Sequence, residues 1–418
     1  MPGTPTIGPA GAQGVREANL GTVLRTIRAA APCSRAEIAA ATGLTKSTVS
    51  SIVADLAARR LVREVGAPAE RRVGRPGVGL ALDERSIAAV GLEVNVDYLT
   101  VVAVDLLEGV LLSRHAAFDA RSAGPEACAE RITGLLAHTV ADPLLRSRTV
   151  LGASVAVPGL VDAPSGVVTN APNLRWTGFP LRERIAGLMA RAGLPAMPLH
   201  VDNDANLGVI AEYRGGHLAG TPDLVYITGE VGVGAGILTG GALLRGSSGY
   251  TGEIGHVPLL RGGPRCGCGR RGCLEALAGV EAVLRHAVPD LMPDGPLSGA
   301  GLSRAVDAAV ARAEAGDPAV RRALRRAGTW LGRGAAALVN VIDPAAVILG
   351  GYFVPLAPWL GPPCAAAVAA HSLAPDRPGR VQTSGLGLTA AARGGASALV
   401  DALDRGRLPL PERAPAPP

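Results

Sequence analysis

Residues 252–279 read GEIGHVPLLRGGPRCGCGRRGCLEALAG, and this stretch places four potential metal ligands within 18 residues. They are His256, Cys266, Cys268 and Cys273. Three thiolates and one imidazole form a closed donor set that suits a structural zinc ion, Zn²⁺, and leave no position for an activated water. The alternative is a set of free thiols in a glycine-rich loop, which this density of ligands disfavours. We therefore expect a zinc ion that organises a loop and takes no part in catalysis.

Polar side chains that could bind a small ligand lie on both sides of the cysteines. Glu253 precedes His256 by three residues, and Glu275 follows Cys273 by two. Asn203 and Asp204 end a predicted buried strand, which is where α/β folds expose their ligand sites. Each of these residues alone is commonly a helix cap or a surface charge. Together with a metal-held loop, their carboxylates and amides suit a ligand with several hydroxyl groups, such as a sugar.

The chain from Ile87 onward has the pattern of an α/β body. Residues 88–106, AAVGLEVNVDYLTVVAVDL, predict two adjacent strands joined by a turn. Further buried strands are predicted in the stretches LGASVAV (151–157), PLHVDND (198–204), LVYITGEVGVGAGIL (224–238) and AAVILGG (345–351). Helical segments alternate with these strands, and no internal repeat with a period of 20–50 residues is evident.

The first 85 residues carry a net charge of +5, whereas the rest of the chain carries +1. Helices are predicted at residues 19–30, 34–43 and 45–60, the second with a capping box formed by Ser34 and Glu37. Two short apolar runs around an arginine-rich turn follow within residues 61–83. Three helices and a hairpin are typical of a winged helix-turn-helix domain, and the basic charge favours binding to nucleic acid.

The third helix of such a domain enters the major groove of DNA. Its predicted buried face consists of Val49, Ile52, Val53 and Leu56. We expect polar and basic residues of the second helix, the third helix and the wing to contact bases or phosphates: Arg35, Thr45, Lys46, Ser47, Thr48, Ser50, Arg71, Arg72 and Arg75. A small helical bundle with an ordinary solvated polar face is the alternative.

Composition and hydropathy also indicate the domain boundaries and the cellular compartment. Residues 1–15 and 408–418 are rich in Gly and Pro and are expected to be disordered, which leaves 16–84 for the DNA-binding domain and 85–407 for the body. No apolar run reaches the roughly 18–20 residues that span a bilayer, and the first residues lack the features of a signal peptide. We expect a cytoplasmic protein that is nucleoid-associated when bound to DNA and has no membrane partner. The remaining cysteines are isolated and are expected to be buried apolar residues: Cys33, Cys128 and Cys364.

Several motifs occur in one order along the body. They are SVAVPGLVD (154–162), NAPNLRW (170–176), VDNDAN (201–206), GEIGH (252–256), CGCGRRGCLE (266–275) and VNVIDPAAVILGG (339–351). This series resembles the ROK family (repressors, open reading frames and kinases) over about residues 87–400. The helix-turn-helix in front is similar to its regulator branch, which includes xylose-type sugar-responsive repressors. The resemblance implies an α/β fold class, with an N-terminal winged helix-turn-helix followed by a two-lobed actin/hexokinase-like body.

The resemblance also implies where a sugar would bind, in the cleft between the lobes. The positions that match the sugar contacts of the family are Gly159, Asn173, Asn203, Asp204, Glu253, His256 and Glu275. Asp204 matches the residue that acts as catalytic base in the kinase members.

The two phosphate loops of the kinase members are altered in this chain. The first resembles D-x-G-G-T-K in kinases, whereas residues 93–98 read EVNVDY, with both glycines lost and Asp97 in place of the threonine. The second resembles G-T-G-x-G-G-G, whereas residues 230–236 read EVGVGAG, so that Val231 removes a hydroxyl and Glu230 adds a carboxylate. Phosphoryl transfer needs donors and positive charge around the phosphates. We therefore expect no kinase activity, with Asp204 as a vestigial base.

These observations favour a sugar-responsive repressor that binds a double-stranded DNA operator and a small sugar effector, as a homodimer or a dimer of dimers. One alternative is a bifunctional sugar kinase with a DNA-binding domain. The other is a DNA-binding regulator whose body only dimerises and binds no small molecule.

Overall fold

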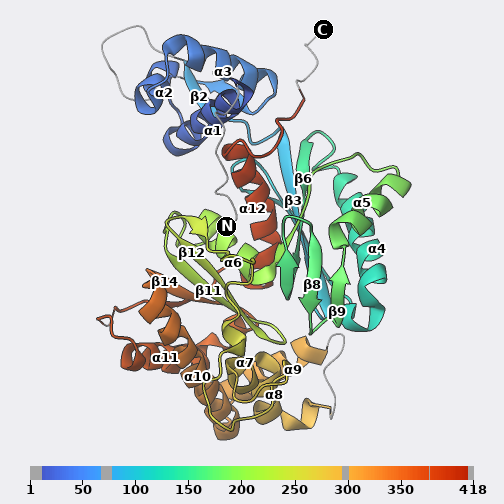
Figure 1. The fold of residues 1–418 in the computed structure, drawn as a ribbon, viewed down its shortest axis with the longest axis vertical. Coiled ribbons are helices and arrows are strands. Elements are labelled where there is room, and N and C mark those ends of the chain that lie inside the picture. Colours follow the sequence, from blue (N-terminus) through green and yellow to red (C-terminus); the bar gives the residue numbers. More distant parts are fainter. Residues whose placement is uncertain (1–11, 67–77, 294–300, 376, 413–418) are drawn as a thin grey trace, which may run out of the picture.

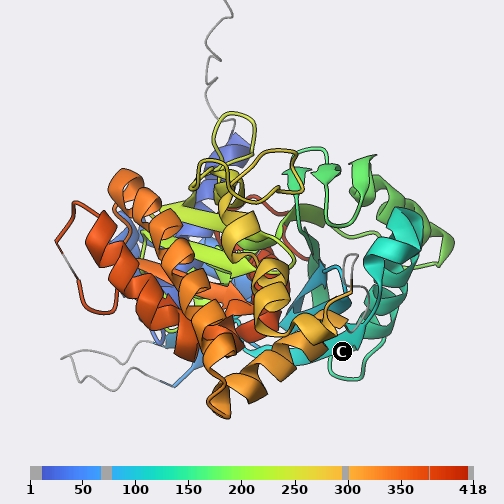
Figure 2. The same cartoon turned by 90° about the horizontal axis from the view of Figure 1, so that it is seen from below.

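The computed structural model describes residues 12–66, 78–293, 301–375 and 377–412. Figure 1 shows three parts: a small helical head, a first lobe around strands β3 and β6, and a second lobe around strands β11 and β14. Helices α12 and α6 run between the two lobes, and the upper end of α12 reaches the head. The view from below in Figure 2 shows the helices of the second lobe layered over its sheet. The predicted fold class, a winged helix-turn-helix followed by a two-lobed α/β body, is confirmed.

The head contains three helices and a two-stranded antiparallel sheet. Its elements are α1 (Ala12–Ala30), α2 (Arg35–Thr42), α3 (Lys46–Ala58), β1 (Val62–Val65) and β2 (Gly79–Leu82). The predicted capping box of Ser34 and Glu37 begins α2, and Gly43, at φ +70°, ends it. The predicted apolar face of α3 is buried, as are Leu20, Val23, Leu24 and Ile27 on α1.

The described residues near both ends of the chain are more ordered than the composition predicted. Helix α1 begins at Ala12, within the segment expected to be disordered, and Arg16 forms a 3.1 Å ion pair with Asp55 of α3. At the other end, Leu408 is buried in the apolar core shared by the head and α12, and Arg59 donates a hydrogen bond to the Pro411 carbonyl. The expectation of disorder is therefore wrong for residues 12–15, which form the first turn of α1, and for residues 408–412, which pack on the head.

The first lobe is built on a five-stranded sheet with the order β10-β6-β3-β4-β5. The strands are β3 (Ile87–Val94), β4 (Tyr98–Val104), β5 (Val110–Ala117), β6 (Thr149–Val157) and β10 (Leu199–Asn203). β3, β4 and β5 form an antiparallel meander, and β6 and β10 continue the sheet in parallel with β3. One face packs against α4 (Ala120–Val140) and α5 (Leu181–Arg191), and the other against α12 (Ala390–Asp404). A small sheet of β7 (Leu160–Asp162), β8 (Val167–Ala171) and β9 (Trp176–Phe179) adjoins it.

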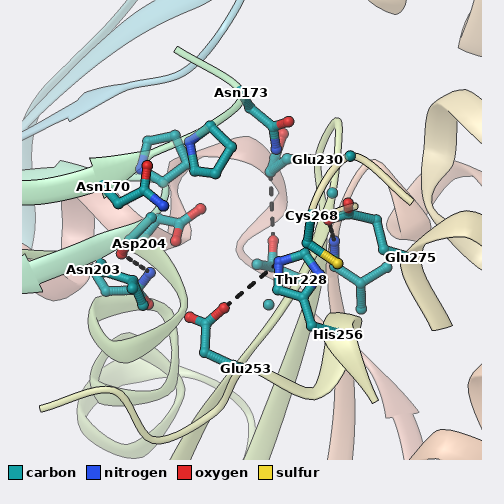
Figure 3. A pocket seen from close by; sticks show the side chains of 18 of the residues that line it. Asn170, Asn173, Asn203, Asp204, Thr228, Glu230, Glu253, His256, Cys268 and Glu275 are labelled. Carbon is teal, nitrogen blue, oxygen red and sulfur yellow. Dashed lines mark hydrogen bonds and ion pairs between the residues drawn. The ribbon is translucent and has the colours of Figure 1, made fainter. Parts of the chain in front are cut away.

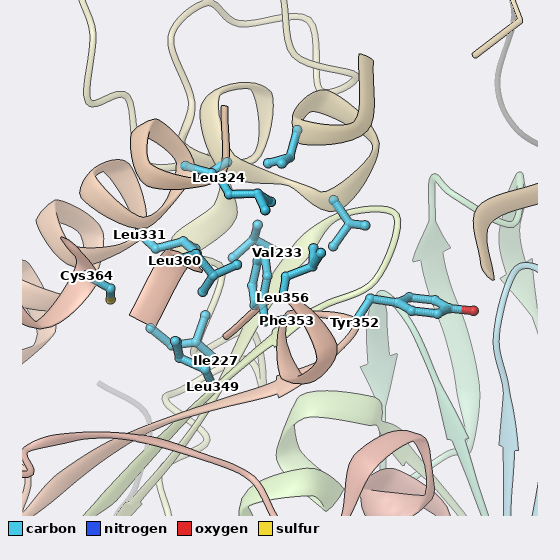
Figure 4. Close-up of a cluster of buried hydrophobic side chains, with 14 of the residues drawn as sticks. Ile227, Val233, Leu324, Leu331, Leu349, Tyr352, Phe353, Leu356, Leu360 and Cys364 are labelled. Atoms are coloured by element: carbon cyan, nitrogen blue, oxygen red, sulfur yellow. The ribbon is translucent and has the colours of Figure 1, made fainter. Parts of the chain in front are cut away.

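The second lobe has a sheet with the order β13-β12-β11-β14-β15. The strands are β11 (Leu224–Gly229), β12 (Val233–Thr239), β13 (Ala242–Leu243), β14 (Ala346–Gly351) and β15 (Val381–Thr383). Its helices are α7 (Leu274–Ala278), α8 (Val280–Ala287), α9 (Gly301–Glu314), α10 (Pro318–Ile342) and α11 (Phe353–His371), with single turns at η1 (Ile254–His256) and η2 (Pro289–Leu291). Phe353 lies at the centre of the core in Figure 4, among Val233, Leu356 and Leu360.

The two five-stranded sheets have the same topology. In each, the first three strands form an antiparallel meander, and two further strands are added in parallel next to the first strand. This repetition is not evident in the sequence, because the two copies share a pattern of buried strands and not a series of identical residues.

The helices between the lobes approach their neighbours closely. Helix α6 (Asp204–Gly215) packs along α12, and a Cβ at Gly394 would lie 1.8 Å from the carbonyl oxygen of Leu207. On the other side, a Cβ at Gly91 of β3 would lie 1.7 Å from the carbonyl oxygen of Ala392. Glycine is therefore required at both positions, and a turn at η3 (Gly387–Thr389) leads into α12.

One helix among the described residues, α11, is long and apolar enough to span a membrane by those criteria alone. Its face containing Leu356, Leu360, Cys364 and Val368 is buried in the core of the second lobe. A Cβ at Gly328 of α10 would lie 2.1 Å from the Leu360 carbonyl oxygen, so that α10 and α11 are in close contact. The packing is that of a core helix of the second lobe.

Candidate functional site

A cavity of about 780 Å³ lies where the first lobe meets the metal-ligand segment of the second. The seven residues that the resemblance assigned to sugar binding all line it: Gly159, Asn173, Asn203, Asp204, Glu253, His256 and Glu275. Figure 3 shows Asn203 and Asp204 on one side of the cavity and Glu253, His256 and Glu275 on the other. Residues from five separate motifs thus meet at one place.

The loop after β6 supports one wall of the cavity. Gly159 has φ +126°, and a Cβ there would lie 2.6 Å from the Asn170 carbonyl oxygen, so that only glycine fits. Its own carbonyl oxygen accepts a hydrogen bond of 3.0 Å from Asn203 Nδ2. Asn203 also caps α6, since its Oδ1 accepts from the backbone N–H of Asn206. Gly159 and Asn203 therefore have structural roles in addition to the predicted contact with a ligand.

Asp204 is the first residue of α6 and is buried at the bottom of the cavity. Its Oδ1 accepts a hydrogen bond of 2.9 Å from the backbone N–H of Ala205. Burial raises the pKa of Asp204 to about 7, and the nearby Glu253 carboxylate adds to this effect. A carboxyl group with such a pKa can accept or donate a hydrogen bond to a ligand hydroxyl near neutral pH.

The four predicted metal ligands converge. One ligand atom from each of His256, Cys266, Cys268 and Cys273 lies within 4.8 Å of all the others. Cys268 Sγ and Cys273 Sγ are 3.8 Å apart, and Cys266 Sγ and His256 Nδ1 are 3.6 Å apart. Tetrahedral zinc with bonds of about 2.3 Å to sulfur and about 2.05 Å to nitrogen requires separations of about 3.8 Å and about 3.6 Å. The cluster could hold a metal ion, and these two separations match those of tetrahedral zinc.

The metal-ligand segment also positions two carboxylates at the cavity. Glu275 lies two residues after Cys273, and its Oε2 accepts a hydrogen bond of 3.4 Å from the backbone N–H of Val233. Glu253 Oε2 lies 3.9 Å from His256 Nε2. A metal ion at the cluster would therefore hold the loops that present both carboxylates.

Behind Asp204, the two equivalent turns of the lobes meet. The turn between β3 and β4 contains Asn95, whose Nδ2 donates a hydrogen bond of 2.7 Å to Oε2 of Glu230, in the turn between β11 and β12. The space bordered by Asp204, Glu230 and Gly351 has a volume of only about 10 Å³, which is about the room of one water molecule. The first lobe and the second are thus joined at the two turns that the resemblance assigned to phosphate loops.

Carboxyl groups fill this contact between the turns. Tyr98 donates a 3.0 Å hydrogen bond to Glu93, and Tyr352, which extends away from the second-lobe core in Figure 4, donates a 3.0 Å hydrogen bond to Asp97. Burial raises the pKa of Glu93 to about 8, with a further contribution from the Asp204 carboxylate. Burial also raises the pKa of Glu230 well above its usual value. Carboxyl groups carry no positive charge, so this contact between the turns offers none to a phosphate.

Three further polar residues line the cavity that the sequence did not indicate: Asn170, Thr228 and Arg270. Asn170 begins the quoted motif NAPNLRW, so that its motif was recognised but its side chain was not selected. Arg270 lies between the predicted metal ligands Cys268 and Cys273, and the pattern of cysteines indicated a metal site only. Thr228 ends a buried strand and gave no separate signal.

The predicted DNA-contacting residues are only partly available in the described structure. Lys46, Ser47 and Ser50 are exposed on α3, and Thr48 is half-buried. Thr45 caps α3 by accepting from the backbone N–H of Thr48. Arg35 forms a 3.1 Å ion pair with Glu64 of β1, a partner that the sequence did not indicate. Arg71, Arg72 and Arg75 lie outside the described residues.

Comparisons with known proteins agree with this architecture. The model of the ROK family matches residues 89–402, and the model of the MarR family matches residues 21–73. The chain is 29% identical over 335 residues to the xylose repressor of Bacillus subtilis (strain 168), with 80% of this chain and 82% of the relative covered. It is 27% identical over 338 residues to the DNA-binding transcriptional dual regulator NagC of Escherichia coli (strain K12), with 81% of each covered.

Solved structures give the same result. A ROK family transcriptional regulator described as a homologue of the E. coli MLC protein matches 94% of this chain and 98% of its own, with a TM-score of 0.77 and 24% identity, which shows the fold. A ROK family glucokinase from Streptomyces griseus, in complex with glucose and AMPPNP, matches 74% of this chain and 98% of its own, with a TM-score of 0.61 and 28% identity. Since the family model covers most of the chain, this protein belongs to the ROK family.

Proposed function

We propose that this protein is a sugar-responsive DNA-binding repressor that transfers no phosphoryl group. Relatives that align with four fifths of the chain are named as repressors or as a transcriptional regulator, and a head of the same kind precedes the body. In this proposal the head binds a palindromic operator as part of a homodimer, in the cytoplasm. A sugar shifts the protein between two states that differ in affinity for DNA.

One observation carries the proposal: an open cavity suited to hydroxyl groups is backed by a closed space where phosphates would be needed. Asn95 and Glu230 fill that space with an amide and a carboxyl group. Phosphoryl transfer depends on cations and oriented N–H donors around the phosphates, and a carboxyl group supplies neither. Asp204 then has no phosphoryl group to act on, and it accepts a hydrogen bond from a sugar hydroxyl.

A zinc ion in the Cys₃His cluster would have a structural role. His256, Cys266, Cys268 and Cys273 would hold it, and the ion would supply cross-links between the loops that carry Glu253 and Glu275. All four ligands come from the protein, so that the cluster would leave no coordination position for substrate.

Three measurements on the full-length protein test the proposal. The first is a gel shift with the DNA upstream of its own gene, at fixed salt, with D-xylose, D-glucose, N-acetyl-D-glucosamine and D-glucosamine added in turn. The second is the thermal shift produced by the same sugars, since a bound ligand raises the melting temperature. The third is a coupled assay of ATP turnover with each sugar, with Asp204→Asn as the control that removes the family's base.

We expect specific DNA binding that one sugar changes, a thermal shift with that sugar, and no ATP turnover above the Asp204→Asn control. Sugar-dependent turnover that the Asp204→Asn change abolishes would establish the kinase alternative. Specific DNA binding without any thermal shift would favour a body that only dimerises. Absence of specific DNA binding would refute the repressor assignment.

A further inference from the structure

The side chains around the cavity have an acidic character. Four carboxyl groups line it, from Asp204, Glu230, Glu253 and Glu275. Among the described lining residues, Arg270 is the only arginine or lysine, and its side chain is exposed to solvent; His256 belongs to the metal-ligand set. Proteins bind phosphate and carboxylate ligands with arginine, lysine or free backbone N–H groups. The lining of this cavity favours hydroxyl and amine groups instead.

A second feature of the cavity that could attract anions, the N-terminus of a helix, is already occupied. Helix α6 points its N-terminus at the cavity, and helix N-termini attract negative charge. Asp204 lies in the first turn, where its carboxyl group accepts the N–H of Ala205, and the side chain of Asn203 accepts the N–H of Asn206. Two of the N–H groups that could bind a phosphate are therefore satisfied by the protein itself.

There is also no room for a phosphate beyond Asp204. The adjoining space holds about 10 Å³, and the hydrogen bond between Asn95 and Glu230 closes it. Opening it would separate the two turns and leave the buried amide of Asn95 without its partner, which costs free energy.

We propose that the effector is an unphosphorylated sugar without acidic groups, either neutral or carrying an amine. This inference rests on the proposed function, because it specifies the ligand of the same cavity. It excludes sugar phosphates and uronic acids on the basis of the carboxyl groups and the closed space.

Isothermal titration calorimetry of the wild-type protein tests this inference by comparing each neutral or amine-bearing sugar with an acidic derivative. D-glucose is compared with glucose 6-phosphate and with D-glucuronate. N-acetyl-D-glucosamine and D-glucosamine are each compared with their 6-phosphate, and D-xylose is titrated as a further sugar. We expect the binding sugar to have a dissociation constant at least about 100-fold below that of its phosphate. A phosphate or uronate that binds as tightly as its parent sugar would overturn the inference. Failure of every compound would instead contradict the proposed function.

A variant sharpens this result. Glu230→Gly removes the carboxyl group and opens the closed space. We therefore expect a fall in the ratio of the dissociation constant of the sugar phosphate to that of its parent sugar. Glu126→Gln is the matched control, because Glu126 is exposed on α4, pairs with Arg184 and is not part of the cavity lining. An unchanged ratio in Glu230→Gly would show that Glu230 does not exclude phosphate.

A second observation concerns the path from the cavity to the head. Helix α6 begins at the cavity with Asp204, and its last turn contains Arg214. Its 12 residues span about 18 Å. Arg214 Nη2 lies 3.1 Å from Oδ2 of Asp404, the last residue of α12, and its Nε donates to Glu108 at 2.6 Å. The far end of α6 is thus fixed to the end of α12.

The same carboxylate holds the head. Arg28 of α1 donates to Asp404 through Nε at 2.8 Å and through Nη2 at 3.0 Å, and its Nη1 donates to the Leu106 carbonyl at 2.7 Å. Asp404 is only 1% exposed, and Arg25 donates to its carbonyl oxygen at 2.9 Å. A buried charge shared by two arginines has little freedom to move independently of them.

The geometry assigns to Arg214, Asp404 and Arg28 the role of positioning residues that couple the cavity to the head. A shift of α6 on sugar binding moves Arg214, and the shared carboxylate transmits that movement to α1. This assignment also rests on the proposed function. It concerns how the ligand acts and is independent of the ligand's charge.

The coupling is measured as the ratio of operator dissociation constants with and without the sugar, using the sugar that binds in the titrations above. Coupling in proteins is typically about 5–150-fold, and the operator must change the sugar affinity by the same factor. We expect Arg28→Gln to retain sugar binding and operator binding while the ratio falls toward one. Arg16→Gln is the control, because Arg16 lies on the same helix but pairs with Asp55 inside the head.

A ratio in Arg28→Gln equal to that of the wild type would overturn the assignment. A ratio of one in the wild-type protein would instead contradict the proposed function. Asp404 keeps Arg214 as a partner in this variant, and the melting temperature of the variant checks that it is folded.

Discussion

The two lobes have sheets of the same topology, yet they contribute to the cavity in different ways. The first lobe supplies residues at the ends of its parallel strands, Gly159 after β6 and Asn203 at the end of β10. In the second lobe, the matching strand β14 ends in two glycines: Gly350 packs against Tyr226, and Gly351 lies next to Glu230. The second lobe contributes Thr228 and Glu230 from the end of β11 and the turn that follows it. The segment between β13 and α8, which contains the metal cluster, adds Glu253, His256 and Glu275. Topology therefore determines where a site can form, and this segment determines much of the chemistry that the second lobe brings to it.

The largest expected effect is the loss of the metal ion, on which we expect the second lobe to depend and the first lobe not to depend. Cys273→Ser removes a ligand from the buried cluster, so that we expect the zinc content to fall from about one ion per chain to near zero and the melting temperature to fall by about 10 °C or more. Elemental analysis and thermal unfolding measure both. Cys128→Ser, a buried cysteine of the first lobe outside the cluster, should retain zinc. Equal zinc content in Cys273→Ser and the wild type would refute the ligand assignment.

The next effect compares glycines in the two lobes. Gly91→Ala in the first lobe forces a Cβ onto the Ala392 carbonyl oxygen and should destabilise the protein by about 3 kcal/mol. Gly361→Ala in α11 of the second lobe meets nothing within 4 Å and should stabilise the protein by about 0.5–1 kcal/mol. Denaturant unfolding gives both values. Two changes of the same sign would contradict the close approach of α12 to β3.

A smaller effect concerns the acids where the lobes meet. The pKa of Glu93 in the folded protein is about 8, above the ordinary value of 4.5, so that its contribution to stability is present below about pH 4.5 and is lost as the pH rises toward 8. Tyr98, Asp204 and Glu230 face this carboxyl group and share in the effect. We expect Glu93→Gln to raise the melting temperature at pH 8 by a few degrees and to change it little at pH 5. A constant difference across this range would argue against a raised pKa.

The smallest expected effects are those of exposed ion pairs. Arg184→Gln removes a pair with Glu126 in the first lobe, and Arg312→Gln removes a pair with Asp290 in the second. Solvent screens both pairs, and each change should shift the melting temperature by less than about 1 °C. A large shift in one lobe alone would show that its surface pair has a structural role that the other lacks.

Local patterns predicted much of this structure. The capping box of Ser34, the apolar face of α3 and the buried strands depend on residues close in sequence, and all are confirmed. The metal ligands lie within 18 residues, so that their spacing alone predicted a cluster that the structure brings together.

Contacts between distant parts of the chain could not be predicted in this way. The pairing of Asn95 with Glu230 joins residues 135 positions apart, and that of Arg28 with Asp404 joins residues 376 positions apart. The sequence indicated only that the phosphate loops were altered and gave no reason for the two turns to bind each other. The tail after Leu408 was misjudged for the same reason, since its apolar partners are in the head.

The tail that packs on the head has a consequence for exchanging domains between relatives. Leu408 contributes to the core that the head shares with α12, and Asp404 holds the head through Arg28. In a chimaera that takes residues 12–82 from another regulator, the transplanted head would therefore contact a C-terminal segment and an Asp404 carboxylate to which it is not matched. Specificity for an operator could be transplanted only together with residues 404–412, so that the unit of exchange in this protein is discontinuous in the gene.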